Sequence, residues 1–269
     1  MRGTSRASLS EAKERLDDVL SSADPATLGD ELFAVLHVLD REHGLRRALS
    51  DPAQPAELKA AAAHDLLHSG LAPATLELVE HVVGLRWSRS PDLTDAIETL
   101  AVISLVASAE TDRRLDDLED ELFRFGRIVA SQPELRRALS DRAASRDGKV
   151  QLVSDLIQDK VTAPAQRLIA EAATYPRGRT LEKTLDVYGG IAAERRSRLI
   201  AVVRTSIELT EPQKTRLTAA LSAQYDRDIH LNIEVDPTVL GGLSVQIGDE
   251  EIDGTIQRRL GDARRRLTP

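Results

Sequence analysis

The chain has 269 residues, of which 41% are hydrophobic and only 3% are aromatic, with a formal net charge of −8. The negative charge disfavours nucleic acid as a main partner, and the absence of cysteine excludes disulfides, thiolate nucleophiles and cysteine-ligated metals. Aromatic side chains dominate interface hot spots and substrate pockets, so their scarcity favours helices packed by Leu, Ala, Val and Ile.

The first feature along the chain is an internal repeat. The string LRRALSD occurs at Leu45–Asp51 and returns at Leu135–Asp141, a spacing of 90 residues. We predict a tandem duplication, with the first repeat unit in 1–92 and the second in 93–188. At the same spacing, further residues are identical in the two copies: Leu28, Asp30, Glu31, Leu32, Phe33, Lys59, Asp65, Leu66 and Leu78 match Leu118, Asp120, Glu121, Leu122, Phe123, Lys149, Asp155, Leu156 and Leu168.

Both repeat units are predicted to be helical. Apolar residues recur at three- and four-residue steps between Leu115 and Val129, which places them on one helix face. Prolines and glycines divide the pattern into short helices, none of which can bury its apolar stripe alone. We therefore expect a mainly α fold, with tandem bundles of about five or six helices each. The longest apolar run, Leu100–Ala109, is too short to span a bilayer.

The pattern changes after Tyr188, where Gly189-Gly190 is a plausible hinge. Residues 199–203 form a strand candidate, and Thr210 opens a capping-box helix with Gln213 three residues on. Residues 229–235 and 243–247 alternate between apolar and polar, as half-buried strands do. Gly248-Asp249 is predicted to form a turn, with a last helix capped by Asp253 or Gly254. Region 189–269 is thus expected to be a small α+β domain.

Three features could suggest a metal or nucleotide site. His64 and His68 are one helical turn apart, but the adjacent Glu of a zinc-protease motif and a nearby third ligand are missing. The acidic cluster within 249–253 lacks the register of a calcium loop, which leaves a turn and a helix cap. Gly241-Gly242 lacks the context of a phosphate-binding loop and favours a tight turn or bulge. We therefore expect no metal, no cofactor and no catalytic residues.

The last predicted helix is basic. Its arginines have three interpretations: nucleic-acid binding, disfavoured by the net charge; placement near a helix C-terminus; or attraction to an acidic partner helix. The sequence does not choose between the last two. The arginines concerned are Arg258, Arg259, Arg264, Arg265 and Arg266.

The segment from Val235 to Leu260 resembles the C-terminal signature of the delta subunit of bacterial F-type ATP synthases, whose mitochondrial counterpart is the oligomycin-sensitivity conferring protein. The segments from Val202 and from Tyr175 are also similar to that family, and the resemblance covers about 93–269. The first repeat is an extra copy. The positions that carry the signature are Asp236, Pro237, Gly241, Gly242, Gly248, Asp249, Asp253, Gly254, Arg259 and Leu260.

The resemblance implies a non-catalytic stator subunit of the peripheral stalk, on the cytoplasmic face of the bacterial plasma membrane. It implies two partners: the N-terminal helices of alpha subunits, and the C-terminal helix of the b subunit, which meets the α+β domain. In the family, an alpha helix lies in a groove between the first and fifth helices. The candidate groove residues here are Leu100, Ile103, Val106, Leu168, Ile169 and Ala172.

Two points stay open at this stage. The first repeat is either a spacer or a second alpha-binding site, with a groove of Leu78, Val79 and Val82 against its first helix. Whether the two units share helices is also undecided. The alternative function is a generic helical-repeat adaptor unrelated to ATP synthase, which would not end in the Asp236–Leu260 pattern.

Overall fold

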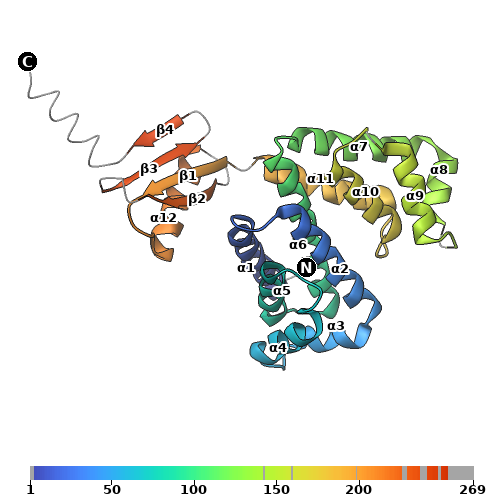
Figure 1. The fold of residues 1–269 in the computed structure, drawn as a ribbon, viewed down its shortest axis with the longest axis horizontal. Coiled ribbons are helices and arrows are strands. Elements are labelled where there is room, and N and C mark those ends of the chain that lie inside the picture. Colours follow the sequence, from blue (N-terminus) through green and yellow to red (C-terminus); the bar gives the residue numbers. More distant parts are fainter. Residues whose placement is uncertain are drawn as a thin grey trace, which may run out of the picture. The chain divides into compact units, whose positions relative to one another are not determined.

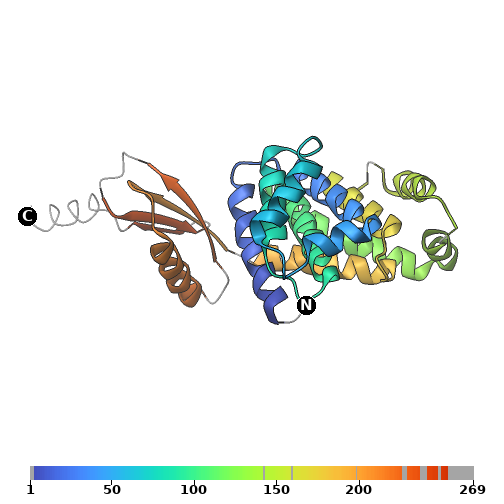
Figure 2. The ribbon, with the colours of Figure 1, turned by 90° about the horizontal axis from the view of Figure 1, so that it is seen from below.

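The computed structural model describes residues 3–141, 143–158, 160–197, 199–225, 229–236, 241–247 and 250–253. It divides into two compact units, Met1–Ala193 and Glu194–Pro269 (Figures 1 and 2). The first unit is helical. Its helices are α1 (Gly3–Leu20), α2 (Pro25–Arg41), α3 (His43–Leu49), α4 (Ala56–Leu67), α5 (Pro73–Gly84), α6 (Ser90–Thr111), α7 (Leu115–Ser131), α8 (Pro133–Ser140), α9 (Arg146–Ile157), α10 (Ala163–Thr174) and α11 (Leu181–Ser197).

The helix boundaries follow the 90-residue period. Helices α2, α4 and α5 begin and end 90 residues before α7, α9 and α10, and α3 begins 90 residues before α8. The same capping contact recurs in both copies. Glu31 on α2 accepts hydrogen bonds from the Ala72 N–H at 3.0 Å and from Thr75, ahead of and within α5. Glu121 on α7 accepts from the Thr162 N–H at 2.8 Å, ahead of α10. The duplication therefore preserves the helix order and how the fifth helix begins.

Helix α6 belongs to both repeats. In the repeat alignment, which adds 90 to each residue number, α1 corresponds to residues 93–110, within α6. Helix α6 itself corresponds to α11. It contacts α1, α2, α3, α5, α7 and α10, so it is apolar nearly all round rather than along one stripe. One apolar core runs from Ala12 to Ala192 through both repeats. The two predicted bundles thus share a helix and a core, which settles the question that the sequence left open.

A glycine permits a close contact between two helices in this core. On α2, a Cβ added at Gly29 would lie 2.7 Å from Cγ of Leu105 and 3.2 Å from the carbonyl oxygen of Ala101, both on α6. Leu105 is buried, so it has little space into which to move. Only a residue without a side chain lets α2 approach α6 this closely.

The second unit contains α12 (Glu211–Tyr225) and a sheet of β1 (Leu199–Thr205), β2 (Ile229–Val235), β3 (Leu243–Ile247) and β4 (Glu250–Asp253) in the order β2-β1-β3-β4. Strand β1 pairs with β2 in parallel, whereas β3 is antiparallel to both β1 and β4. The apolar positions of the alternating strands meet α12 in a small core that includes Ala201, Val203, Leu221 and Val245. The mainly α fold with a small α+β unit is as predicted.

Two local features differ from what the sequence suggested. Glu250–Asp253 is a strand paired with β3, which satisfies its backbone groups. The turn predicted at Gly248-Asp249 and the helix that Asp253 or Gly254 would cap lie outside the described residues. Gly189 and Gly190 lie inside α11 and do not form a hinge. The predicted last helix, with its five arginines, lies outside the described residues.

Candidate functional site

The most elaborate polar contact in the helical unit joins the two repeats. Three residues of α2 face the fifth helix of the second repeat and the loop that follows it. Asp30 pairs with Arg167 on α10, and Asp40 accepts a hydrogen bond from Nε of Arg177 at 2.8 Å. Between them, His37 lies 2.6 Å from Oε1 of Glu171. We call this set the inter-repeat contact.

Aromatic stacking reinforces the inter-repeat contact. The ring of His37 stacks on Tyr175 with centroids 3.5 Å apart, and its other neighbour is Phe33, at 6.5 Å. The guanidinium of Arg146 lies over the opposite part of the stack, 4.2 Å from the Tyr175 centroid. Phe33 and Glu171 are buried, whereas His37 between them stays partly exposed.

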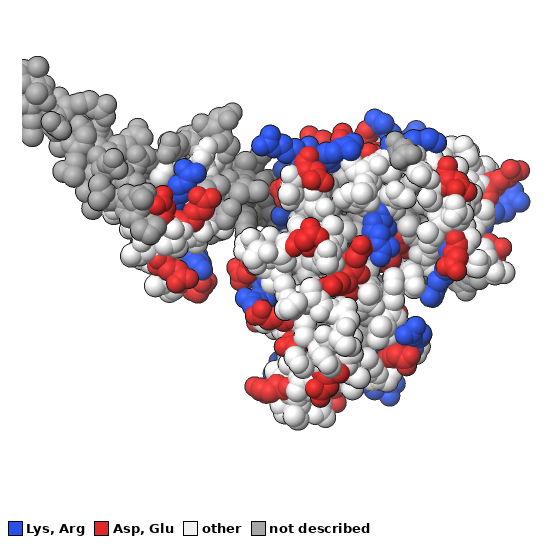
Figure 3. Space-filling view, viewed as in Figure 1, with Lys and Arg blue, Asp and Glu red and all other residues white. Residues whose placement is uncertain are grey.

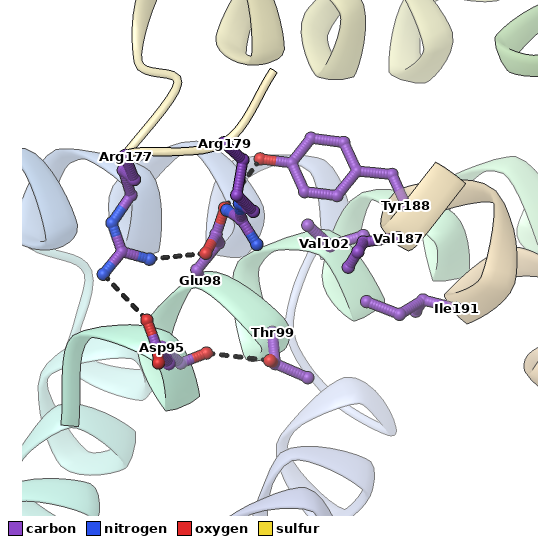
Figure 4. A pocket seen from close by; sticks show the side chains of 9 residues that line it. All are labelled: Asp95, Glu98, Thr99, Val102, Arg177, Arg179, Val187, Tyr188 and Ile191. Atoms are coloured by element: carbon purple, nitrogen blue, oxygen red, sulfur yellow. Dashed lines mark hydrogen bonds and ion pairs between the residues drawn. The ribbon is translucent and has the colours of Figure 1, made fainter. Parts of the chain in front are cut away.

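Arg177 connects the inter-repeat contact to a charged cluster on α6. Its guanidinium donates to Oγ1 of Thr94 at 2.8 Å, to Asp95 at 3.1 Å and to Glu98. Figure 4 shows Arg177 and Arg179 directed at Glu98, which also accepts a hydrogen bond from the Tyr188 hydroxyl at 3.0 Å. The backbone of Arg177 has a positive φ of 47°. A non-glycine residue holds this conformation only where its surroundings fix it.

The electrostatics of the cluster favour a clamp over acid–base chemistry. Burial alone lowers the pKa of Arg177, but Glu98, Asp40 and Asp95 offset this and hold its pKa above the ordinary value. Burial, helped by the charges of Glu98 and Glu171, raises the pKa of Tyr188 far above its usual range. Both groups therefore keep their protons at any physiological pH. A cavity of about 330 Å³ adjoins the cluster, and its carboxylate Glu98 is already held by two arginines and a phenol.

The first repeat carries a groove where the second repeat carries the inter-repeat contact. This first-repeat groove is a depression of about 610 Å³ between α1, α4 and α5, in which the small or apolar Ala56, Ala60, Gly84 and Leu85 lie beside charged side chains. Four of its lining residues are Arg15, Glu77, His81 and Leu85. Moved by 90 residues, they correspond to Leu105, Arg167, Glu171 and Tyr175, each of which lies against Gly29, Asp30 or His37 of α2. Helix α2 thus covers, on the second repeat, the equivalent of the α1 and α5 side of this groove, whereas Val150 on α9, the equivalent of Ala60, is exposed.

The comparisons with known proteins decide the family. The family model "ATP synthase delta (OSCP) subunit" matches residues 101–267. The ATP synthase subunit delta of Thermobifida fusca is 52% identical over 99% of both chains, and that of Streptomyces avermitilis is 51% identical over 98% of both. This chain belongs to the ATP synthase delta (OSCP) subunit family.

As a member of this family, the chain is a non-catalytic subunit of an ATP synthase and a component of its peripheral stalk. The delta family model begins at residue 101, inside α6, and therefore leaves most of the first repeat out. The relatives, by contrast, align over nearly the whole chain, so they carry the first repeat as well. A chain of the Toxoplasma gondii mitochondrial ATP synthase hexamer aligns over 62% of this chain and 95% of its own at 15% identity, but a TM-score of 0.29 carries no argument about the fold.

The structure buries the six residues expected to line an alpha-subunit groove. They form the packed contact of α6 with α10 and the rest of the core. Leu78, Val79 and Val82 of the first repeat are buried in the same way. The groove assignment stays a prediction, but the surface beside these residues differs between the repeats: it is covered by α2 in the second and open in the first. The exposed fractions of the six are Leu100 0%, Ile103 6%, Val106 0%, Leu168 0%, Ile169 0% and Ala172 1%.

The delta-family signature residues lie at the strand ends of the second unit. The Asp236 N–H donates to the Thr205 carbonyl at 2.8 Å, which extends the pairing of β1 with β2. Gly241 and Gly242 have positive φ angles of 64° and 84° ahead of β3, a conformation that glycine adopts without strain. Asp253 pairs with Ser244 at the end of β4. The other signature positions, Pro237, Gly248, Asp249, Gly254, Arg259 and Leu260, lie outside the described residues.

The remaining signals have structural explanations. His64 pairs with Glu80 at 2.7 Å, and His68 contacts the His64 carbonyl at 3.1 Å. Among the described residues, no group of three or more His, Cys, Asp or Glu side chains could hold a metal ion. No helix within the described part of the chain is both long and apolar enough to cross a membrane.

Sequence reasoning missed the inter-repeat contact and the clamp at Glu98. Arg177 carries no motif, and its role depends on a loop conformation that composition does not reveal. The alignment of the two repeats did contain one indication of this contact. His37 aligns with Arg127 and Glu171 aligns with His81, so the copies differ in charge where one is covered and the other is not.

Proposed function

We propose that this chain ties the catalytic head of the ATP synthase to its peripheral stalk, with one partner for each compact unit. The helical unit receives an alpha-subunit N-terminal helix, and the unit from Glu194 onward receives the C-terminal helix of a b subunit. The observation that carries the proposal is the pairing of two differently built units in a chain of the delta family. The site of action is the cytoplasmic face of the bacterial plasma membrane, to which the chain is peripheral.

The fused core supports a load-bearing role. Two repeats that share α6 cannot rotate against each other without breaking one continuous core. Arg177 and Arg179 add charged bonds between the loop after α10 and helix α6. A subunit that resists torque gains from such rigidity, because a flexible link would let the head turn with the rotor.

The first-repeat groove is the favoured position for the alpha helix. A depression between helices that carries both small apolar and charged residues can accept an amphipathic helix, which presents both kinds of side chain. The equivalent surface of the second repeat already binds a helix, α2 of the same chain. The α1 and α5 side of the groove therefore corresponds to a surface that packs against a helix in the second repeat, and we expect one alpha site of this kind per chain rather than two.

A peptide titration tests the alpha site. The probe is a synthetic peptide of the alpha-subunit N-terminus from the same organism, titrated calorimetrically into the full chain. Ala60 on α4 lines the groove, whereas its neighbour Ala61 is exposed and does not line it. We expect a stoichiometry near one, and a loss of affinity of about tenfold or more for Ala60→Arg but not for Ala61→Arg. Equal affinity of the two variants for the peptide contradicts the assignment of the alpha site to the first-repeat groove. A stoichiometry of two indicates that the second repeat also binds an alpha helix.

A further inference from the structure

The inter-repeat contact has two sides, and the repeat places a copy of each side at an end of the helical unit. One side is the groove of the first repeat. The other is the face of α2 that carries Asp30, Phe33 and His37, which is repeated on α7 as Asp120, Phe123 and Arg127. We call these three residues the α7 face. Helix α10 contacts α7 on one side and α2 on the other.

The aromatic residue of the α7 face is uncovered. Phe33 is fully buried, whereas its equivalent Phe123 is 65% exposed. Phe123 is one of only three phenylalanines in the chain, and an exposed phenyl ring leaves a large apolar area in water. Since the same position in the first repeat is covered, the exposure at Phe123 marks a contact that the chain itself does not complete.

The charges around Phe123 indicate what the partner carries. His37 meets the carboxylate of Glu171 at 2.6 Å, and the α7 face replaces that histidine by Arg127, a permanent cation. Asp120 keeps the acidic position of Asp30, which pairs with Arg167. Asp120 also pairs with Arg124 one turn along α7, an exposed pair that a partner's cation can replace at little cost. Figure 3 shows acidic and basic side chains mixed along this edge of the unit.

A second copy of the chain is disfavoured as the partner. Head-to-tail stacking would place the first-repeat groove of one copy on the α7 face of another. Glu77 would then stand opposite Asp120, and His81 opposite Arg127, where the inter-repeat contact has Arg167 and Glu171. The two carboxylates Glu77 and Asp120 repel each other, and His81 offers Arg127 no carboxylate, so the two ends of the helical unit are not complementary to each other.

We propose that the α7 face binds a helix of another protein that resembles α10 in its chemistry. That helix presents an apolar surface to Phe123, a carboxylate to Arg127 and, one turn before the carboxylate, a basic residue to Asp120. Glu119 occupies the position where Gly29 allows the closest approach of α2 to α6. The partner helix therefore packs on the Asp120–Arg127 part of α7 rather than along its whole length. This surface is separate from the first-repeat groove, so its occupancy does not depend on the proposed alpha site.

Site-specific photocross-linking in the assembled ATP synthase tests this surface. A photoreactive phenylalanine analogue, p-benzoylphenylalanine, replaces Phe123, and the complex is isolated from native membranes and irradiated. The cross-linked peptide is then sequenced by mass spectrometry. A matched control places the analogue at Leu66, which is 58% exposed on α4. We expect a single segment from a different subunit, with an acidic residue one helical turn after a basic residue, and several-fold less product at Leu66.

A charge substitution separates a specific contact from a merely apolar one. Arg127→Glu should reduce the cross-linking yield at position 123 at least several-fold, whereas Arg136→Glu on α8, also exposed, should leave it unchanged. Fluorescence of Trp87, the single tryptophan, verifies that each variant is folded. The proposal is overturned by the absence of a product, by a cross-link to another copy of this chain, by equal yields at Leu66, or by a segment without the charge pattern.

Discussion

The contact of α2 with α6 allows a prediction in which the same substitution has opposite effects at two glycines. Gly29 lies in the interior of α2 and Gly126 in the interior of α7. In each helix, replacing Gly by Ala should add about 1 kcal/mol of stability from helix propensity. At Gly126 the new Cβ would meet its nearest neighbour, Cδ1 of Leu185, at an ordinary 3.8 Å. We therefore expect Gly126→Ala to stabilise the helical unit.

At Gly29 the methyl group has no room. It would lie 2.7 and 2.8 Å from two carbon atoms of Leu105 and 3.2 Å from a backbone oxygen, so either the leucine or the helix must move. Forcing one methyl group into a packed core costs about 1–3 kcal/mol. Because the propensity gain is common to both variants, their difference isolates this steric cost. Gly29→Ala should thus be about 1–3 kcal/mol less stable than Gly126→Ala.

Urea unfolding followed by tryptophan fluorescence measures this difference. Trp87 is the single tryptophan, is buried and belongs to the helical unit, so its signal does not mix with unfolding of the second unit. The urea midpoints of the two variants can be compared directly if the free energy of unfolding of each depends on urea concentration with the same slope. If Gly29→Ala is as stable as Gly126→Ala, or more so, the close packing of α2 on α6 is not the feature that joins the repeats.

Three further substitutions test the clamp, the second unit and the pH dependence. Arg177→Ala should cost the helical unit about 3 kcal/mol in urea unfolding, because it removes one partner from a buried charge cluster whose Glu98 keeps other donors. Gly242→Val should lower the protection of the β1 and β3 amides from hydrogen exchange, by more than about 1 kcal/mol, since valine resists a φ of 84°. Burial tends to raise the pKa of Asp92, but hydrogen bonds from Arg89 and Ser5 outweigh it and hold that pKa below its ordinary 3.8. The stabilisation from Asp92 is therefore present above about pH 3.8 and lost as pH falls through the folded-state pKa, so Asp92→Asn should destabilise at pH 7 and progressively less below pH 3.8.

Each of these substitutions has a control or a contrary outcome. Arg41→Ala, at a side chain that is 75% exposed, should cost less than about 1 kcal/mol, and an equal cost for Arg177→Ala would remove the clamp from the account. Unchanged exchange in Gly242→Val would mean that another backbone conformation serves equally well before β3. A difference between the wild type and Asp92→Asn that stays constant down to pH 2 would contradict the sign of the pKa shift.

The period of the duplication could be read from the sequence because repeated helices keep their length and caps. The identical string LRRALSD and the matched Glu31 and Glu121 place the second set of helix boundaries 90 residues after the first. The alternating strands were equally predictable, because apolar and polar side chains alternate every two residues in a half-buried strand. The short strand β4 was not predicted, since its four residues include three acidic side chains and only one apolar side chain.

The way in which the repeats join was not predictable from pattern alone. The sequence pattern of an apolar residue on α6 or α10 is the same whether the residue packs in the core or lines a groove for a partner, so Leu100 and Ile169 could not be assigned to core or groove. Arg177 acts through a loop conformation with positive φ, which no local motif specifies. Only the three-dimensional arrangement distinguishes the covered Phe33 from the exposed Phe123.

The central claim, that the two units of this chain hold two different parts of the ATP synthase, is tested most directly inside the intact complex. The chain has no cysteine, so Ala60→Cys in the first-repeat groove and Ala219→Cys on α12 each provide a unique attachment point within it for a photoreactive cross-linker. We predict that the probe at position 60 labels the N-terminus of an alpha subunit and that the probe at position 219 labels the C-terminal region of a b subunit. Labelling of the same partner from both positions, or the reverse pairing, would contradict the account.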